Sequence, residues 1–147
     1  MAGTLIVFEG TDGSGKSTQF QRLCQRVSQS GREFQQLVFP QYQEPSSALI
    51  RMYLNGEFGS HPEDVNPYAA SAFYAVDRYA SLKKVWGDYY QSGGLILTDR
   101  YTTSNAVHQA VKCPPQERGD FLRWLVDVDH TKLGLPRPHL VLYLLLP

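Results

Sequence analysis

The sequence feature that most constrains this chain is a glycine-rich loop near its N-terminus. Residues 10–17 read Gly-Thr-Asp-Gly-Ser-Gly-Lys-Ser, which fits the phosphate-loop pattern G-x-x-x-x-G-K-[ST]. An apolar run at residues 5–8 precedes the loop, and apolar residues at helical spacing, among them Phe20, Leu23 and Val27, follow it. A buried strand, a phosphate loop and an amphipathic helix are therefore predicted to follow one another, as at the start of a parallel α/β fold.

The loop predicts a nucleoside-triphosphate site. Glycines allow the backbone to wrap around a phosphate, and the N–H groups at the helix N-terminus then point at the anion. We expect Lys16 to reach the β- and γ-phosphates and the Ser17 hydroxyl to ligate magnesium. The alternative is a glycine-rich turn with an exposed lysine, and we expect Lys16 to be solvated while the site is empty. The predicted nucleotide-binding residues are Gly10, Thr11, Asp12, Gly13, Ser14, Gly15, Lys16, Ser17 and Thr18.

Strand and helix patterns alternate along the rest of the chain. Further strands are predicted at residues 34–39, 95–97 and 140–146. Helices are predicted at residues 46–54, from Pro67 to the pair Gly93-Gly94, at 102–111 and around Phe121, Trp124, Leu125 and Val128. One face of the long helix is expected to carry Ala75, Tyr79, Leu82, Trp86 and Tyr89. The alternation predicts a P-loop NTPase three-layer sandwich, a parallel sheet with helices on both faces, as a single domain over residues 1–147.

Composition narrows the class of partner. The 14 Lys and Arg residues balance 14 Asp and Glu residues, which argues against a broad basic surface for nucleic acid. Two cysteines, Cys24 and Cys113, are too few for a disulfide framework and are expected to be reduced. No signal peptide is apparent, and the longest apolar run, residues 140–146, is too short to span a membrane. We therefore expect a cytoplasmic protein that binds neither nucleic acid nor membrane. Because the chain stops directly after an apolar strand, we also expect it to be C-terminally incomplete.

Asp99-Arg100-Tyr101 follows the predicted strand at residues 95–97. The carboxyl ends of strands face the phosphate loop in this class of fold. Asp99 is therefore placed to hold magnesium, directly or through water, and Arg100 to clamp a phosphate with two hydrogen bonds. The alternative is a surface Asp–Arg pair.

Two helices carry further candidates for binding an acceptor. Tyr74 and Arg78 lie one turn apart, so that a ring would stack on a base while an arginine donates to a base carbonyl. The alternative is that Tyr74 packs in the core and Arg78 extends to water. Asn105, His108 and Gln109 share one face of the next helix and would hydrogen-bond an acceptor. For His108 the alternative is a solvated or hydrogen-bonded helix histidine.

Four segments, taken together, resemble the thymidylate kinase family. Residues 8–18 resemble its phosphate loop, Phe39-Pro40 its Phe-Pro pair, residues 73–78 its aromatic-x-x-x-Arg segment, and residues 99–106 its Asp-Arg-Tyr segment. The four occur in the order found in the family. The resemblance implies transfer of a phosphoryl group from ATP to dTMP, giving dTDP, with magnesium, in a protein that forms a homodimer.

The resemblance also implies roles for individual residues, with Lys16, Asp12 and Arg100 as the catalytic ones. It implies that Lys16 binds ATP and Ser17 binds magnesium, while Arg100 binds the acceptor phosphate. Asp12 would contact the 3′-hydroxyl region of the acceptor, and Phe39 would line the acceptor pocket. For the base, the resemblance implies stacking on thymine by Tyr74 with Phe73 as the fallback, donation to thymine O4 by Arg78 and contact by Asn105.

The sequence departs from the family pattern at three places. Gln41 stands where members often carry an arginine, so the acceptor phosphate would depend more on Arg100 or on Arg51. His108 stands where many members have an aromatic residue that crowds the ribose 2′ position, which leaves discrimination against ribose open. The family continues beyond the fourth strand into an arginine-bearing lid, a fifth strand and a closing helix, and we expect the lid region to be absent from this sequence.

Two other functions remain open at this level. A deoxynucleoside kinase shares the fold and the phosphate loop but needs a carboxylate to deprotonate a 5′-hydroxyl. A non-catalytic nucleotide-binding module would bind ATP without turnover. A GTPase is disfavoured because the sequence has no Asn-Lys-x-Asp segment to read guanine.

Overall fold

The computed structural model describes residues 2–145 and divides into two compact units. Within the described residues, unit 1 comprises residues 2–39, 82–101 and 136–145, and unit 2 comprises residues 40–81 and 102–135. Each unit is therefore assembled from segments that are distant in the sequence.

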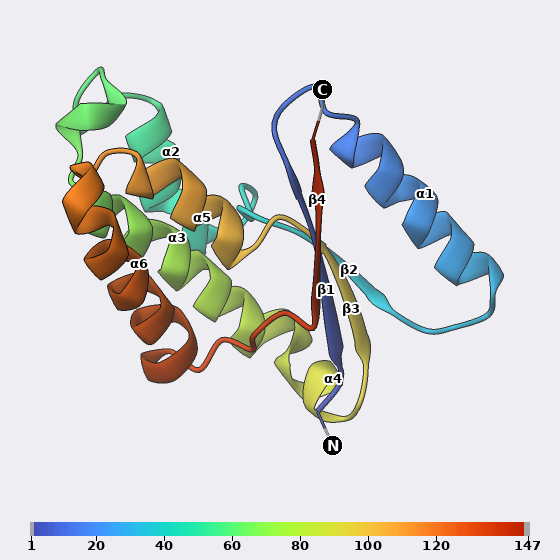
Figure 1. Cartoon of the computed structure of the whole chain (residues 1–147). Coiled ribbons are helices and arrows are strands. Elements are labelled where there is room, and N and C mark those ends of the chain that lie inside the picture. The colour runs from blue at the N-terminus through green and yellow to red at the C-terminus, as the bar shows by residue number, and fades with distance from the viewer. Residues whose placement is uncertain (1, 146–147) are drawn as a thin grey trace. The chain divides into compact units, whose positions relative to one another are not determined.

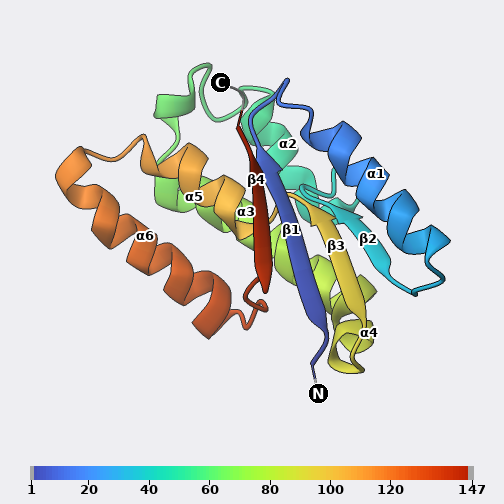
Figure 2. The same cartoon turned by 45° about the vertical axis from the view of Figure 1, so that its right-hand side comes forward.

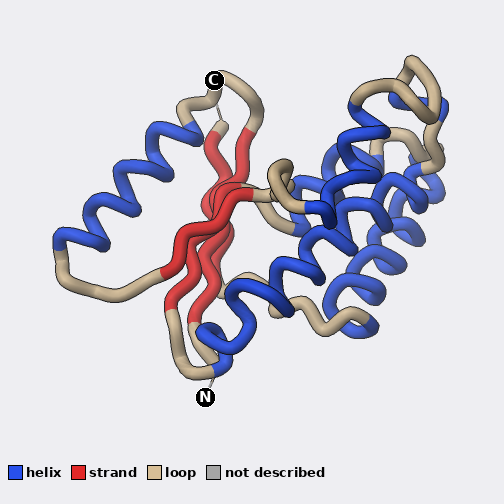
Figure 3. The backbone as a smooth tube through the Cα atoms, turned by 180° about the vertical axis from the view of Figure 1, so that it is seen from behind, coloured by secondary structure: helices blue, strands red, loops and turns tan. Residues whose placement is uncertain are grey.

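Unit 1 is built on a parallel sheet of four strands. These are β1 (Thr4–Gly10), β2 (Gln35–Val38), β3 (Leu95–Asp99) and β4 (Leu140–Leu144), in the order β2-β3-β1-β4. All three neighbouring pairs are parallel, and Figure 2 shows the strands side by side. The same sheet is drawn in red in Figure 3. The carboxyl ends of β1 and β3 consequently meet at one edge, because Phe8 lies opposite Asp99.

Helix α1 (Lys16–Gln29) covers one face of this sheet (Figure 1). Its apolar side packs in a cluster with residues from β1 and β3, namely Phe8, Phe20, Cys24, Leu95 and Leu97. The rings of Phe8 and Phe20 meet edge to face with centroids 5.5 Å apart. Leu5 and Val7 point to the opposite face of the sheet and are fully buried. Both faces of β1 are therefore covered, as the continuous apolar run predicted.

Unit 2 is helical. It contains the short 3-10 turns η1 (Pro45–Ser47), η2 (Pro62–Asp64) and η4 (Pro115–Glu117), the α-helices α2 (Ala48–Leu54), α3 (Pro67–Ser81), α5 (Thr102–Ala110) and α6 (Arg118–Val126), and the π-helical segment η5 (Asp127–Lys132). Helix α5 packs against both α3 and α6. Ala110, Cys113, Phe121 and Leu125 form a buried cluster, and the Tyr68 ring stands edge-on against Trp124 with centroids 4.7 Å apart.

The predicted long helix is interrupted. Helix α3 ends at Ser81, the π-helical segment η3 (Leu82–Trp86) follows, and α4 (Gly87–Gln91) completes the run. Because a π-turn holds more residues than an α-turn, the buried stripe changes phase at this point. Beyond it Trp86 and Tyr90 are buried, and Tyr89 is partly buried. Tyr79, which precedes the π-helical segment, is exposed, so the predicted stripe is wrong at Tyr79.

Most other predicted elements are confirmed with small shifts of their ends. Strand β4 ends at Leu144, and Leu146, the predicted end of that strand, lies outside the described residues. Cys24 and Cys113 are free, buried thiols, as expected. Among residues 2–145, no helix has the length and apolar character that a membrane span requires.

Candidate functional site

The phosphate loop lies between β1 and α1, and its backbone conformation requires glycine. Gly13 and Gly15 adopt φ of 78° and 84°, although a Cβ at either position would meet no atom within 4 Å. The requirement is therefore conformational rather than steric. Gly15 is the N-cap of α1, no side chain of the described residues caps the helix, and the first helical turn contains no acidic residue. The N–H groups of this turn are consequently available to an anion.

Lys16 is held in an ion pair with Asp99 at the end of β3. Only 7% of Lys16 and 8% of Asp99 is exposed. The expectation that Lys16 is solvated in the empty site is therefore wrong. The reason is the parallel pairing of β1 with β3, which brings the two residues together across 83 positions of sequence. Ser17 and Thr18, by contrast, are exposed at the start of α1.

Arg100 has the left-handed backbone conformation, with φ of 70°, which is unfavourable for a residue with a side chain. Hydrogen bonds on both sides fix it. Its N–H donates to the Phe8 carbonyl at 2.9 Å, and its own carbonyl accepts from the Thr98 hydroxyl at 2.9 Å. The following N–H, of Tyr101, donates to the buried Glu9 carboxylate at 3.1 Å. This conformation sets the direction of the Arg100 side chain.

The Arg100 guanidinium lies beside the phosphate loop. Its Nη2 is 3.3 Å from Oδ1 of Asp12, whose side chain is fully exposed, and 23% of the Arg100 side chain is exposed. Phe39 is buried, and its N–H donates a hydrogen bond to the Asp99 carbonyl at 3.0 Å. The centroids of the Phe39 and Tyr101 rings are 6.0 Å apart. Unit 1 therefore brings together the loop, Asp12, Phe39, Asp99 and Arg100.

Arg78 is buried within unit 2 and does not extend to water. Its Nη2 donates to both carboxylate oxygens of Asp129, at 3.1 and 3.3 Å. Burial raises the pKa of Asp129, while Arg78 and then His130 act in the opposite direction. No sequence motif indicates Asp129, although this residue continues the apolar spacing of Phe121 and Leu125 along the helix. An acidic residue at such a position is a signal that could have found it.

Tyr74 lies one turn before Arg78 and is half-buried. Burial raises the pKa of Tyr74 to about 12, Tyr42 and Tyr53 act in the same direction, and Arg78 lowers it. The ring is therefore an uncharged phenol at neutral pH. Phe73, the fallback for stacking, has its ring 5.7 Å from that of Phe58.

Helix α5 carries one exposed and two buried candidates. His108 is exposed, whereas Asn105 and Gln109 are buried. The Asn105 amide donates to the Ser71 hydroxyl of α3 at 3.0 Å. Within the described residues, the Nε of Arg78, the Oδ1 of Asn105 and the Oε1 of Gln109 are buried and have no hydrogen-bond partner. Buried polar atoms of this kind are unusual in native structures unless a ligand or water pairs with them.

The segment after Phe39-Pro40 is held by Asp77 and Arg51. Asp77 accepts from the Gln41 N–H at 2.8 Å and from the Ser46 hydroxyl at 2.6 Å. Arg51 donates from Nη1 to the carbonyl of Tyr42 at 2.7 Å and also to Ser47. Arg51 therefore holds the loop in place, and these contacts explain its position without a bound phosphate.

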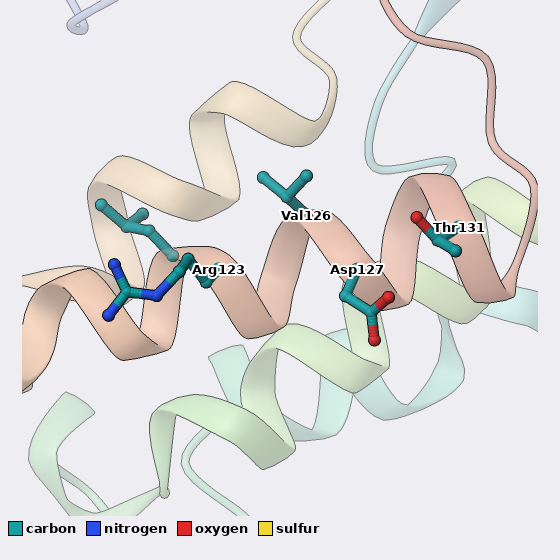
Figure 4. Close-up of a pocket in the computed structure, with 5 residues that line it drawn as sticks. Arg123, Val126, Asp127 and Thr131 are labelled. Carbon is teal, nitrogen blue, oxygen red and sulfur yellow. The ribbon is translucent and has the colours of Figure 1, made fainter.

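A surface pocket lies elsewhere, on the outer side of α6 and η5 (Figure 4). It has a volume of about 360 Å³ and is lined by Leu122, Arg123, Val126, Asp127 and Thr131. None of the sequence-predicted site residues lines it. It is therefore separate from both groups of candidate residues.

Comparison with known proteins gives one consistent result. The family model of thymidylate kinase matches residues 8–147. The thymidylate kinase of Mycobacterium tuberculosis is 31% identical over 135 residues, which cover 91% of this chain and 62% of the relative. The thymidylate kinase of Danio rerio is 33% identical over 142 residues, which cover 97% of this chain and 60% of the relative.

The solved structure of thymidylate kinase from Candida albicans resembles this one with a TM-score of 0.76 and 29% identity, over 99% of this chain and 64% of that one. The predicted fold class, a P-loop NTPase α/β fold with a parallel sheet, is thereby confirmed. The chain spans about 60% of the length of the curated relatives named above. The family model covers nearly the whole sequence and includes the loop and the Asp99-Arg100 segment, so this chain belongs to the thymidylate kinase family.

Proposed function

We propose that this protein transfers the γ-phosphoryl group of ATP to dTMP, giving dTDP. The observation that carries the proposal is the meeting of the phosphate loop, Lys16, Asp99 and Arg100 at the carboxyl ends of β1 and β3. Membership of the family supports the same reaction. We also propose that residues 1–147 act as a single domain in this reaction.

Unit 1 supplies the groups for phosphoryl transfer. N–H groups of the loop and of the first turn of α1 bind the phosphates of ATP, and Lys16 reaches these phosphates by leaving Asp99. Asp99 and Ser17 offer a carboxylate and a hydroxyl, the hard oxygen donors that magnesium prefers, so they would hold that ion. Magnesium held there would neutralise part of the charge on the phosphates of ATP.

The acceptor is itself an anion, so no strong general base is needed. Catalysis rests on positioning two anions and neutralising them. Arg100, fixed in direction by its backbone, binds the acceptor phosphate. Asp12 lies within reach of the same guanidinium and would contact the 3′-hydroxyl region, and Phe39 would line the acceptor pocket.

Unit 2 supplies recognition of the base. The uncharged ring of Tyr74 stacks on thymine. Arg78, whose Nε has no partner among residues 2–145, donates to a base carbonyl. Asn105 contacts the base through its amide oxygen, which has no hydrogen-bond partner in the described part of the chain. The exposed His108 would lie beside the sugar.

The wider setting of the reaction is also proposed. We propose a cytoplasmic homodimer with ATP and dTMP as its ligands and with neither nucleic acid nor membrane as a partner. The family resemblance supports the dimer, and the balance of 14 basic and 14 acidic residues argues against a nucleic-acid surface.

An acceptor panel tests the proposal. The protein is assayed with ATP and magnesium against dTMP, dUMP, dCMP, UMP and thymidine, with dTMP expected to be the best acceptor. Thymidine as the best acceptor would show a deoxynucleoside kinase instead. ATP binding without any product would show a non-catalytic nucleotide-binding module.

A further inference from the structure

We infer that Asp129 is a positioning residue that fixes the Arg78 guanidinium for recognition of a pyrimidine with a carbonyl at its 4-position. The inference rests on the proposed function, because it concerns how that site selects its acceptor. It assigns to Asp129 the selection of thymine and uracil against cytosine.

The contact between the two residues is direct and buried. Only 3% of the Arg78 side chain and 1% of the Asp129 side chain is exposed. One terminal nitrogen of the guanidinium, Nη2, serves both carboxylate oxygens. The Nε donor remains without a partner within the described part of the chain. Asp129 therefore binds the guanidinium through Nη2 and leaves the Nε–H as a donor for a ligand.

The surrounding backbone explains how Asp129 reaches this place. It lies in the π-helical segment η5, which continues from α6, and its own carbonyl accepts from the Leu135 N–H at 2.9 Å. π-helical turns are rare and occur often at functional sites. The segment is tied down on both sides of Asp129, because the Leu133 N–H also donates to the Val128 carbonyl at 2.9 Å.

A guanidinium cannot stay in this position without a counter-charge. Arginine is always protonated in proteins, and a buried, unpaired cation is strongly unfavourable. Without the carboxylate of Asp129, the long side chain of Arg78 would turn until its head reached water. The Nε donor of Arg78 would then be lost from the buried side of α3. Ser71 lies on the same side of α3 and accepts the hydrogen bond from Asn105.

The chemistry of the bases turns this donor into a selector. Thymine and uracil carry an accepting oxygen at position 4, whereas cytosine carries an amino group that donates. A fixed N–H donor binds the first two and repels the third, while the 5-methyl group of thymine is not read by this contact. Loss of a well-placed donor should therefore change the dTMP-to-dCMP ratio and leave the dTMP-to-dUMP ratio unchanged.

The experiment compares Asp129→Asn with a matched control in the same segment. Asp127→Asn is the control, because Asp127 is 45% exposed, pairs with Lys132 at 3.1 Å and lines the surface pocket of Figure 4. Binding and kcat/KM are measured for dTMP, dUMP and dCMP, together with the melting temperature. In Asp129→Asn the preference for dTMP over dCMP should fall by about tenfold or more, as for loss of one charged hydrogen bond. Asp129→Glu, which keeps the carboxylate, should retain most of the preference for dTMP over dCMP. Asp127→Asn should retain all of this preference.

Two further arms separate positioning from a structural role. Arg78→Lys is combined with Asp129→Asn, and the second change should have little further effect on base preference, because both act through one guanidinium. In the nucleotide-free wild type, the Arg78 Nε–H resonance, identified by its absence from Arg78→Lys, should be protected from solvent exchange. This measurement needs no variant of Asp129 to fold.

The outcomes are distinct. A lower melting temperature for Asp129→Asn with unchanged base preference would make Asp129 structural only and overturn the inference. Rapid exchange of the Arg78 Nε–H in the wild type would overturn it as well. A wild type that does not prefer dTMP to dCMP would overturn the proposed function together with this role of Asp129.

Discussion

At the scale of single residues, the site is defined by buried charges with partners far away in the sequence. Lys16 pairs with Asp99, and Arg78 pairs with Asp129, 51 positions further along. Both pairs lie away from solvent, so removal of one partner leaves a charge in a poorly hydrated place. Substitutions at these positions should therefore change stability as well as ligand binding.

Lys16→Ala should affect both properties. Turnover should fall by ~10²-fold or more, as for loss of one preorganised donor to a transferring phosphoryl group. The free energy of unfolding of the nucleotide-free protein should fall by about 3 kcal/mol, because Asp99 is left buried without its counter-charge. Denaturant unfolding and steady-state kinetics measure the two effects.

The double variant Lys16→Ala with Asp99→Asn is the control. It should regain part of the lost stability, because the uncompensated charge is gone, and it should regain no activity. A single variant as stable as the wild type would show that the pair contributes nothing in the empty site.

At the scale of elements, the predictions that succeeded were local ones. The strand before the loop, the loop itself and α1 follow from residue spacing within one segment. The π-helical segment η3 was missed because the spacing from Ala75 to Tyr89 also fits a continuous helix. The ion pair of Lys16 with Asp99 and the contact of Arg78 with Asp129 were missed because they are set by strand pairing and helix packing, which spacing within one segment does not encode.

The turn after β3 offers a test of the left-handed conformation at Arg100. Arg100→Gly and Arg100→Ala both remove the guanidinium, so both should bind dTMP weakly and turn over slowly. Glycine adopts a φ of 70° without strain, so Arg100→Gly should be more stable than Arg100→Ala by about 1 kcal/mol. Thermal or denaturant unfolding of the two variants measures the difference. Equal stabilities would mean that the turn relaxes when the side chain is removed.

At the scale of the whole molecule, the candidate residues divide by chemical task. Unit 1 holds the phosphate loop and Arg100, and unit 2 holds Tyr74, Arg78 and Asn105. Under the proposed function, phosphate chemistry and base recognition would thus fall to different units. Substitutions in unit 2 should therefore change dTMP binding while leaving ATP binding intact.

Tyr74→Ala tests this division. Loss of base stacking should weaken dTMP binding by about tenfold, since stacking on an aromatic side chain contributes roughly 1–3 kcal/mol per base. The affinity for ATP should not change. Tyr79→Ala, at an exposed position on the same helix α3, is the control and should bind both nucleotides as the wild type does. Calorimetric titration with each nucleotide gives the affinities. An equal loss for ATP and dTMP would contradict the division.

The pairing of Lys16 with Asp99 also bears on how the resting protein meets the many small anions of its surroundings. The loop at rest presents backbone dipoles to an approaching anion, while the field of its lysine is largely cancelled by the neighbouring carboxylate. An ion such as chloride or inorganic phosphate would have to draw the lysine away from Asp99 and gains few contacts in return. A triphosphate bound as proposed would make many contacts along the loop, and these would offset the cost of that separation. The resting charge balance should thus disfavour weakly bound competitors before a nucleotide binds.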